Sequence, residues 1–113
     1  MTTVGQLLMV GIEGTKVTPE LKLFLKETGA GGVILFKRNY EHPRQLADFV
    51  QGLRDASEQP LLVAVDQEGG RVARFREGFT IFPAMASLGA MGEEGPAVAE
   101  AVGRAIAREL AAV

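Results

Sequence analysis

The sequence lacks cysteine altogether and contains one histidine, and these two scarcities exclude several kinds of site. Without cysteine there is no disulfide framework, no thiolate zinc site and no cysteine nucleophile, which fits a reducing compartment. The one histidine, His42, precedes Pro43 and has no second ligand or carboxylate at metal spacing. We therefore expect a surface role for His42, and we expect neither a bound metal nor another cofactor.

A long apolar run and an excess of one charge are also missing. The strictly apolar stretches are far shorter than the roughly 18 residues of a membrane span, and residues 1–3 lack the basic start of a secretory signal. Twelve basic residues stand against fourteen acidic ones, which gives a formal net charge of −2 without a basic stripe. The sequence thus predicts a cytoplasmic protein with no membrane and no nucleic-acid partner.

What the sequence does contain is an alternation of two apolar periodicities within 113 residues, a length that suits one domain or part of one. Short β-rich apolar runs predict strands at residues 7–12, 33–36 and 61–65. The run at 33–36 has no polar alternation, which is typical of a strand covered on both faces. Residues 67–95 are punctuated by glycine and predict a long irregular loop, a feature that is usually functional in a compact domain.

Three helices are expected between and after these strands. In the first, Thr18 suits the N-cap, Pro19 suits the first helical position, and Gly29 ends the helix. The apolar residues expected on its buried face are Leu21, Phe24 and Leu25.

The other two helices also show apolar residues at helical spacing, at intervals of three and four in one and at steps of four in the other. One runs from Pro43 to about Ala56, and its apolar face consists of Leu46, Phe49, Val50 and Leu53. The last begins at Pro96, and its apolar stripe consists of Val98, Val102, Ile106 and Leu110. Small alanines between the residues of this stripe would let the last helix lie close to a sheet.

The elements follow the order β-α-β-α-β-loop-α, which calls for parallel strands joined by right-handed crossovers. Two α/β architectures fit this order: a doubly wound open sheet and the opening of a (β/α)8 TIM barrel. A barrel places consecutive strands side by side, whereas a doubly wound sheet usually places strand three across strand one. Three strands are few for either architecture, so the chain is interpreted as truncated after its last helix.

The most informative segment is residues 66–74, where charge follows directly on the apolar run 61–65. Its sequence is Asp66-Gln67-Glu68-Gly69-Gly70-Arg71-Val72-Ala73-Arg74. Parallel α/β proteins build ligand sites at the carboxyl ends of their strands, so we expect function here. Taken by itself, Asp66 has an equally good structural explanation as a cap of the turn after its strand.

Neighbouring charged residues have structural and functional explanations as well. We expect Glu68 to organise the loop from a buried position, and Arg71 to form an ion pair with Glu68 or Glu77. Arg38 and Asn39 follow the second strand, from where they either approach the same pocket or orient their own loop.

Three stretches of the chain resemble family 3 glycoside hydrolases, in particular the bacterial β-N-acetylhexosaminidases of cell-wall (peptidoglycan) recycling. They are residues 5–11, residues 31–36 with Arg38 and Asn39, and residues 65–72 with Arg74. The run Asp-Gln-Glu-Gly-Gly-Arg-Val is the specific part of the resemblance. It implies a (β/α)8 barrel, which needs at least ~200 residues. Residues 1–113 would then be a partial catalytic domain, the opening third or so of that barrel.

The resemblance also implies roles for two residues: Asp66 binds hydroxyls of the sugar in the cleaved subsite, and Arg74 contacts substrate. The chemistry agrees, because an ionised carboxylate accepts hydrogen bonds from adjacent hydroxyls and a guanidinium supplies fixed donors. The family's aspartate nucleophile and its Asp-His acid/base pair lie further along the sequence, so no catalytic residue is expected here. Asp66 and Glu68 would flank a sugar from one side, whereas retaining hydrolysis needs groups on opposite sides.

Two functions are therefore considered. The first is the substrate-binding N-terminal part of a retaining glycoside hydrolase that removes β-linked N-acetylglucosamine from cell-wall fragments, inactive by itself. The alternative is a non-catalytic α/β module that binds a small polar ligand or another copy of itself. A homo-oligomer is expected in addition, because strands 7–12 and 61–65 would be exposed edges. Inward-facing side chains would also lack the opposite barrel wall, namely Val33, Leu35, Val63 and Val65.

Overall fold

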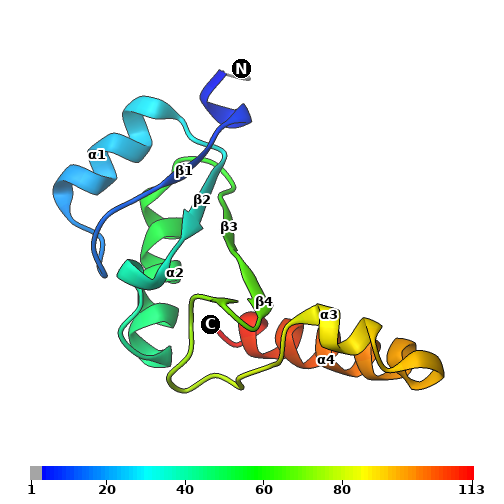
Figure 1. The fold of residues 1–113 in the computed structure, drawn as a ribbon. Coiled ribbons are helices and arrows are strands. Elements are labelled where there is room, and N and C mark those ends of the chain that lie inside the picture. The colour runs from blue at the N-terminus through cyan, green and yellow to red at the C-terminus, as the bar shows by residue number, and fades with distance from the viewer. Residues whose placement is uncertain (1–3) are drawn as a thin grey trace.

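The computed structural model describes residues 4–113, and its centre is a three-stranded parallel sheet (Figure 1). The strands are β1 (Met9–Gly11), β2 (Gly32–Leu35) and β3 (Leu62–Val65), in the order β1-β2-β3. The register places Val33 beside Val10 on one side and beside Val63 on the other. Parallel strands in sequential order confirm the barrel-type arrangement, and β3 does not pair with β1 as a doubly wound sheet would require.

The first helix, α1 (Pro19–Thr28), begins and ends where the sequence indicates. The Thr18 hydroxyl accepts a hydrogen bond from the backbone N of Leu21 at 3.2 Å, and Gly29 adopts a left-handed conformation with φ 60°. Leu25 is buried and Leu21 packs against the core. Phe24 was expected on the same face, and this is wrong, because its side chain is 38% exposed.

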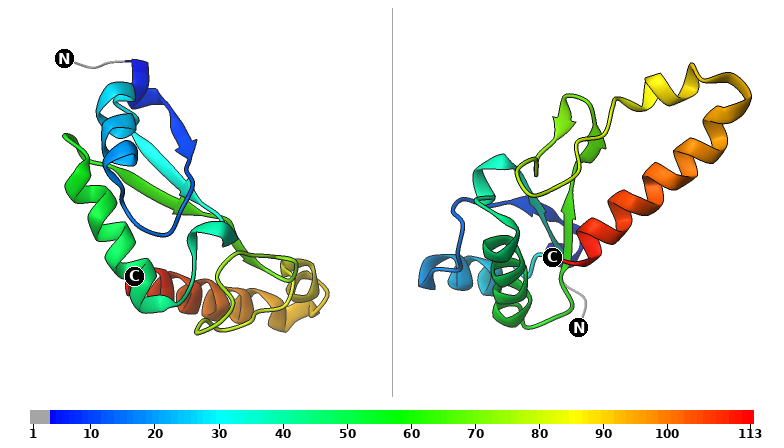
Figure 2. Two further views of the ribbon diagram at one scale, coloured as in Figure 1. Left: turned by 90° about the vertical axis from the view of Figure 1, so that its left-hand side faces the viewer. Right: turned by 90° about the horizontal axis from the view of Figure 1, so that it is seen from below.

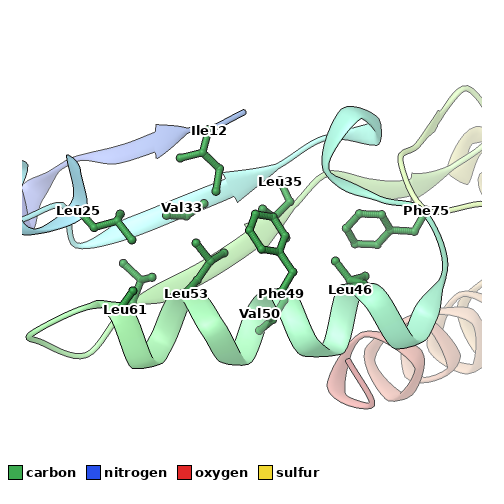
Figure 3. Packing of buried hydrophobic residues seen from close by; sticks show 11 residues of the cluster. Ile12, Leu25, Val33, Leu35, Leu46, Phe49, Val50, Leu53, Leu61 and Phe75 are labelled. Atoms are coloured by element: carbon green, nitrogen blue, oxygen red, sulfur yellow. The ribbon is translucent and has the colours of Figure 1, made fainter. Parts of the chain in front are cut away.

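The second helix, α2 (Pro43–Ala56), supplies most of the core, and all four residues expected on its apolar face are buried. Leu53 and Phe49 point from α2 towards the sheet, where Val33 and Leu35 meet them (Figure 3). Each such side chain contributes roughly 1.5–3 kcal/mol through burial. His42 is the N-cap, and its Nδ1 accepts a hydrogen bond from the backbone N of Gln45 at 3.1 Å.

The sheet has one covered face and one open face. Val33 and Leu35 are 0% and 2% exposed because they face α1 and α2, and Val63 and Val65 pack against the same core. The expectation that these four side chains face an absent barrel wall is therefore wrong. Since side chains alternate along a strand, Met9 and Leu62 lie on the other face. They are 45% and 70% exposed.

Several boundaries differ from the expected ones. The segment Val4–Leu7 is a 3-10 helix, so the first strand begins only at Met9. β2 ends at Leu35 because Phe36 is already the N-cap of a second 3-10 helix, Lys37–Asn39. The backbone N of Phe36 donates to the Asn39 side chain at 2.9 Å instead of continuing the sheet.

The long segment after β3 is more ordered than a loop. It contains a two-stranded antiparallel sheet of β4 (Gln67–Gly69) and β5 (Val72–Ala73). Helix α3 (Met85–Gly89) and the 3-10 helix Gly92–Glu94 follow. These elements are short, and glycine breaks between them hide their periodicity in the sequence.

The last helix, α4 (Gly95–Ala111), projects from the sheet, and α3 lies alongside it (Figures 1 and 2). Only its end returns to the core, through Leu110 and Val113. A cavity of about 280 Å³ remains there between α2, β3 and the end of α4. The expectation that α4 lies close to the sheet is wrong over most of its length, and no residue of its apolar stripe is buried.

Within residues 4–113, no helix combines the length and the hydropathy that crossing a membrane requires.

Candidate functional site

The carboxyl ends of the three parallel strands bring together segments that are distant in the sequence. Leu35 at the end of β2 is in register with Val65 at the end of β3, so Phe36 and Asp66 are the residues that follow on the two strands. The end of β1 joins them through the carbonyl oxygen of Ile12. This carbonyl accepts hydrogen bonds from Arg38 Nε at 3.1 Å and from Asn39 Nδ2 at 3.0 Å.

Asp66 and Arg74 face each other across the start of the hairpin. Arg74 Nη2 lies 4.0 Å from Asp66 Oδ2, and the two side chains are 32% and 48% exposed. At this distance and exposure the pair contributes little to stability. No hydrogen bond among residues 4–113 uses the Asp66 carboxylate to cap the turn, so its oxygens remain available to a ligand.

Gln67 is the residue that brings Arg74 next to Asp66. Its Oε1 accepts hydrogen bonds from the backbone N of Arg74 at 2.9 Å and of Phe75 at 3.2 Å. Its Nε2 donates to the carbonyl of Phe75 at 2.7 Å. A neutral amide suits this role because it donates and accepts at once. The expectation that Glu68 organises the loop from a buried position is wrong, since Glu68 is exposed and Gln67 does the organising.

Gly69 and Gly70 form the turn of the hairpin, with φ of 90° and 58°. Both values lie in the left-handed region that favours glycine. A Cβ on Gly69 would lie 2.4 Å from the carbonyl oxygen of Pro83, and the backbone N of Gly70 donates to the carbonyl of Phe82 at 2.8 Å. The two glycines thus allow a sharp turn that approaches residues 82–84 closely.

Asn39 is the other residue whose role the structure decides. It is 0% exposed, its Oδ1 accepts from Phe36 N, and its Nδ2 donates to the carbonyls of Ile12 and Gly14. Asn39 therefore ties the end of β1 to the end of β2, which is the orienting role considered from the sequence.

The arginines near the turn behave differently from one another. Arg71 is exposed and forms no ion pair within residues 4–113, so the expected pair with Glu68 or Glu77 is wrong. Arg76, which sequence reasoning did not single out, donates from Nη1 to the carbonyl of Gly70 at 3.1 Å and supports the turn. Only the path of the backbone reveals this contact, because the sequence alone would predict that a basic residue at position 76 is a solvated surface charge.

The site is suited to binding a polar, uncharged ligand. Asp66 offers acceptors to hydroxyl groups, and Arg74 offers planar donors to ring or carbonyl oxygens. Residues 4–113 contain no group of three or more histidine or carboxylate side chains placed to hold a metal ion. Asp66 and Glu68 flank Gln67 at alternate positions of one extended segment, so they lie on the same side and do not oppose each other across a ligand.

Taken together, these features define a class: a parallel βα array with a polar site at the carboxyl ends of its strands, where barrel enzymes bind substrates. The "Glycosyl hydrolase family 3 N terminal domain" profile matches residues 2–113. The chain belongs to this family. Its parallel β1-β2-β3 array therefore belongs to the barrel-like domain of this family, of which the chain covers the opening part.

Curated relatives named beta-hexosaminidase match most of the chain. The relative from Alkalilimnicola ehrlichii is 48% identical over 95 residues, which cover 84% of this chain and 27% of the relative. The relative from Nitrosomonas eutropha is 46% identical over 105 residues, which cover 93% of this chain and 30% of the relative. The chain thus spans less than a third of the length of these relatives.

Solved structures show the same fold. NagZ from Neisseria gonorrhoeae, in complex with N-trifluoroacetyl-D-glucosamine, matches with a TM-score of 0.83 at 40% identity, covering 92% of this chain and 32% of that one. A family 3 β-N-acetylglucosaminidase from Paenibacillus matches with a TM-score of 0.89 at 33% identity, covering 99% of this chain and 22% of that one.

Proposed function

We propose that this chain is the substrate-binding N-terminal part of a β-N-acetylhexosaminidase. Asp66 accepts hydrogen bonds from hydroxyls of a terminal N-acetylglucosamine, and Arg74 donates to the same sugar. The observation that carries the proposal is the half-exposed Asp66 carboxylate facing Arg74 at 4.0 Å, at the carboxyl edge of the sheet of a family 3 chain. The glucosamine derivative bound to the NagZ structure supports the choice of sugar.

The reaction of the whole enzyme is retaining hydrolysis that releases β-linked N-acetylglucosamine from cell-wall fragments, in the cytoplasm. Such hydrolysis needs a nucleophile and an acid/base on opposite sides of the scissile bond. Asp66 and Glu68 share one side, so both catalytic groups come from outside these 113 residues. We therefore expect the chain alone to bind sugar without hydrolysing it, since binding groups by themselves leave the barrier in place.

We also propose that the chain self-associates. Self-association is expected both of the enzyme part and of the alternative, a non-catalytic module that binds another copy of itself. Leu62 on the edge strand β3 and Met9 on the edge strand β1 are 70% and 45% exposed on one open sheet face. Apolar side chains beside an exposed strand edge favour pairing with a second copy. Light scattering of the chain at micromolar concentration should show a homo-oligomer, and a monodisperse monomer would contradict this part of the proposal.

Substitution of Asp66 tests the sugar-binding role. One hydrogen-bonding charged group is worth roughly 1.5–3 kcal/mol, so Asp66→Ala should weaken N-acetylglucosamine binding about tenfold to over a hundredfold. In a catalytically active polypeptide that contains this chain, kcat/KM should fall to a similar extent. The matched control is Glu58→Ala, whose carboxylate is 71% exposed beside Lys26. Normal binding by Asp66→Ala together with a lower melting temperature would instead assign Asp66 a structural role in the turn.

A turnover assay tests the expectation that the chain alone does not hydrolyse the glycoside. The chain alone should release no chromophore from a chromogenic β-N-acetylglucosaminide above the level of a mock preparation. Turnover that is lost on changing Asp66 or Glu68 would show that these two carboxylates form a catalytic pair after all.

A further inference from the structure

Two guanidinium groups lie against the aromatic ring of Phe36, the residue that follows β2. Arg38 Cζ lies 4.8 Å from the ring centroid, and Arg74 Cζ lies 5.8 Å from it. A guanidinium within about 6 Å of a ring centroid is attracted by the negative face of the ring. One half-buried ring therefore connects Arg74, which is proposed to bind sugar, to Arg38 in the 3-10 helix Lys37–Asn39.

Arg38 is fixed in place by the end of β1. Its Nε donates to the carbonyl of Ile12 at 3.1 Å and lies 3.3 Å from Glu13 Oε1. The guanidinium fits there because Gly11 has no side chain: a Cβ on Gly11 would lie 3.2 Å from Arg38 Nη2. Arg38 thus lies over the Phe36 ring while it is hydrogen-bonded to the end of β1.

Arg74, by contrast, has few groups that could set the direction of its side chain. Its Nε is buried and has no hydrogen-bond partner among residues 4–113, and the 4.0 Å contact with Asp66 is longer than a hydrogen bond. Gln67 fixes the backbone of Arg74 and leaves the guanidinium unconstrained. The guanidinium therefore has the Asp66 carboxylate on one side and the Phe36 ring on another, and neither forms a hydrogen bond with it.

We infer that Phe36, held by Arg38, is a positioning residue for Arg74: it directs the guanidinium so that its donors and the Asp66 carboxylate meet the same sugar. This inference rests on the proposed function in taking Arg74 as a sugar-binding residue. It adds a role for a side chain that offers the sugar no polar group of its own.

The test compares variants of Phe36 that keep or lose the ring. Phe36→Leu removes the aromatic face but retains apolar bulk, whereas Phe36→Tyr keeps the ring. A surface cation–π contact is worth about 0.5–1 kcal/mol, so Phe36→Leu should bind N-acetylglucosamine about two- to fivefold more weakly in an NMR titration of this chain. Phe36→Tyr should bind as the parent does. The control for loss of an arginine is Arg44→Gln, an exposed residue of α2 that pairs with Asp48.

A double-mutant cycle separates positioning from a general structural role. In an Arg74→Ala background, Phe36→Leu should weaken binding no further, because the residue that it positions is gone. An equal loss with and without Arg74, or unchanged binding by Phe36→Leu, would overturn the inference. Arg38→Gln should weaken binding in the same direction as Phe36→Leu, and it leaves the Phe36 ring in place should Phe36→Leu fold poorly.

If the parent chain binds no sugar, that result counts against the proposed function alone. A second measurement then tests whether the Phe36 ring positions Arg74. The Nε–H resonance of Arg74 should be displaced upfield by the Phe36 ring current. It should move towards its ordinary position in Phe36→Leu, remain displaced in Phe36→Tyr, and shift in Arg38→Gln. The same resonance position in the parent and in Phe36→Leu would show that the ring does not direct Arg74.

Discussion

Helices α2 and α4 carry equally regular apolar stripes, yet only α2 buries its stripe. Leu46 and Leu53 of α2 are 1% and 0% exposed, whereas Val102 and Ile106 of α4 are only partly buried. A stripe at helical spacing therefore specifies which face of a helix seeks apolar contact. Whether a partner lies opposite that face depends on where the connections place the helix.

The connections differ in the two cases. The start of α2 is held next to the end of β2, because Gln45 Nε2 donates to the carbonyl of Asn39 at 3.1 Å. The start of α4 comes after the β4–β5 hairpin and α3, which carry the chain away from the sheet (Figure 2). Only the end of α4 returns, where Glu109 accepts a hydrogen bond from Thr80 N at 3.2 Å and Leu110 reaches the core.

The largest expected effect contrasts the two stripes directly. Leu53→Ala should lower the free energy of unfolding by about 2–5 kcal/mol, because it removes a fully buried side chain and leaves a cavity. Ile106→Ala should lower it by about 1 kcal/mol or less, since that side chain is only partly buried and lies outside the core cluster. Urea denaturation followed by circular dichroism measures both values. Equal losses would indicate that the α4 stripe is covered in solution, as self-association would allow.

The next effect concerns the junction between β1 and β2. Asn39→Ala should lower the free energy of unfolding by about 1–3 kcal/mol, because the Gly14 carbonyl and the Phe36 N–H lose their side-chain partner and the Ile12 carbonyl keeps only Arg38. Gln51→Ala is the control, since its amide bonds Asp55 on the exposed face of α2. A stability loss as small as that of the control would mean that water replaces the Asn39 side chain.

A smaller and more local effect is expected in the hairpin. Gln67→Ala removes the side chain that accepts hydrogen bonds from the backbone N of Arg74 and Phe75. Amide hydrogen exchange at both positions should therefore become about fivefold to tenfold faster, which corresponds to roughly 1 kcal/mol. Exchange in β2 should stay unchanged. Glu68→Ala, an exposed neighbour, serves as the control. Unaltered exchange at Arg74 would show that β4–β5 pairing alone holds the hairpin.

The smallest expected effect is a pH dependence from Tyr40, which packs on Phe75 at 5.0 Å between ring centroids. Burial raises the pKa of the Tyr40 hydroxyl above its ordinary value of 10.0, and the nearby Glu77 carboxylate adds to this. The folded state therefore holds the proton more tightly than the unfolded state, so its contribution to stability is complete below pH 10 and is lost as pH rises through the raised pKa. Tyr40 is the single tyrosine, so absorbance at alkaline pH titrates it alone. A folded-state midpoint at or below that of the urea-unfolded chain would contradict this.

Much of the part of the chain from β1 to β3 was predictable from the sequence, because the signals that specify its elements are local. The cap at Thr18, the stop at Gly29 and the apolar face of α2 each depend on residues within a few positions of one another. Strand order followed from the barrel resemblance, which the parallel β1-β2-β3 sheet confirms. The junction of apolar strand and charged turn likewise placed Asp66 at the carboxyl edge.

The errors fell where a residue's role depends on partners distant in the sequence. Glu68 and Gln67 are both polar and adjacent, and only the β4–β5 pairing decides that Gln67 meets the backbone of Phe75 while Glu68 faces solvent. Arg71 had nearby acids in sequence and pairs with none of them within the described part of the chain.

By itself, therefore, the sequence determined the three parallel strands, the two caps of α1, the core face of α2 and the place of the Asp66–Arg74 segment, because these depend on spacing and on the preferences of individual residues. Tertiary structure alone decided that the Phe36 ring lies against both Arg38 and Arg74 and that α4 projects from the sheet. The physical reason is that cation–π contacts and helix packing require atoms from separate segments to meet at a few ångströms. That meeting is set by the register of the strands and by the path of the connections.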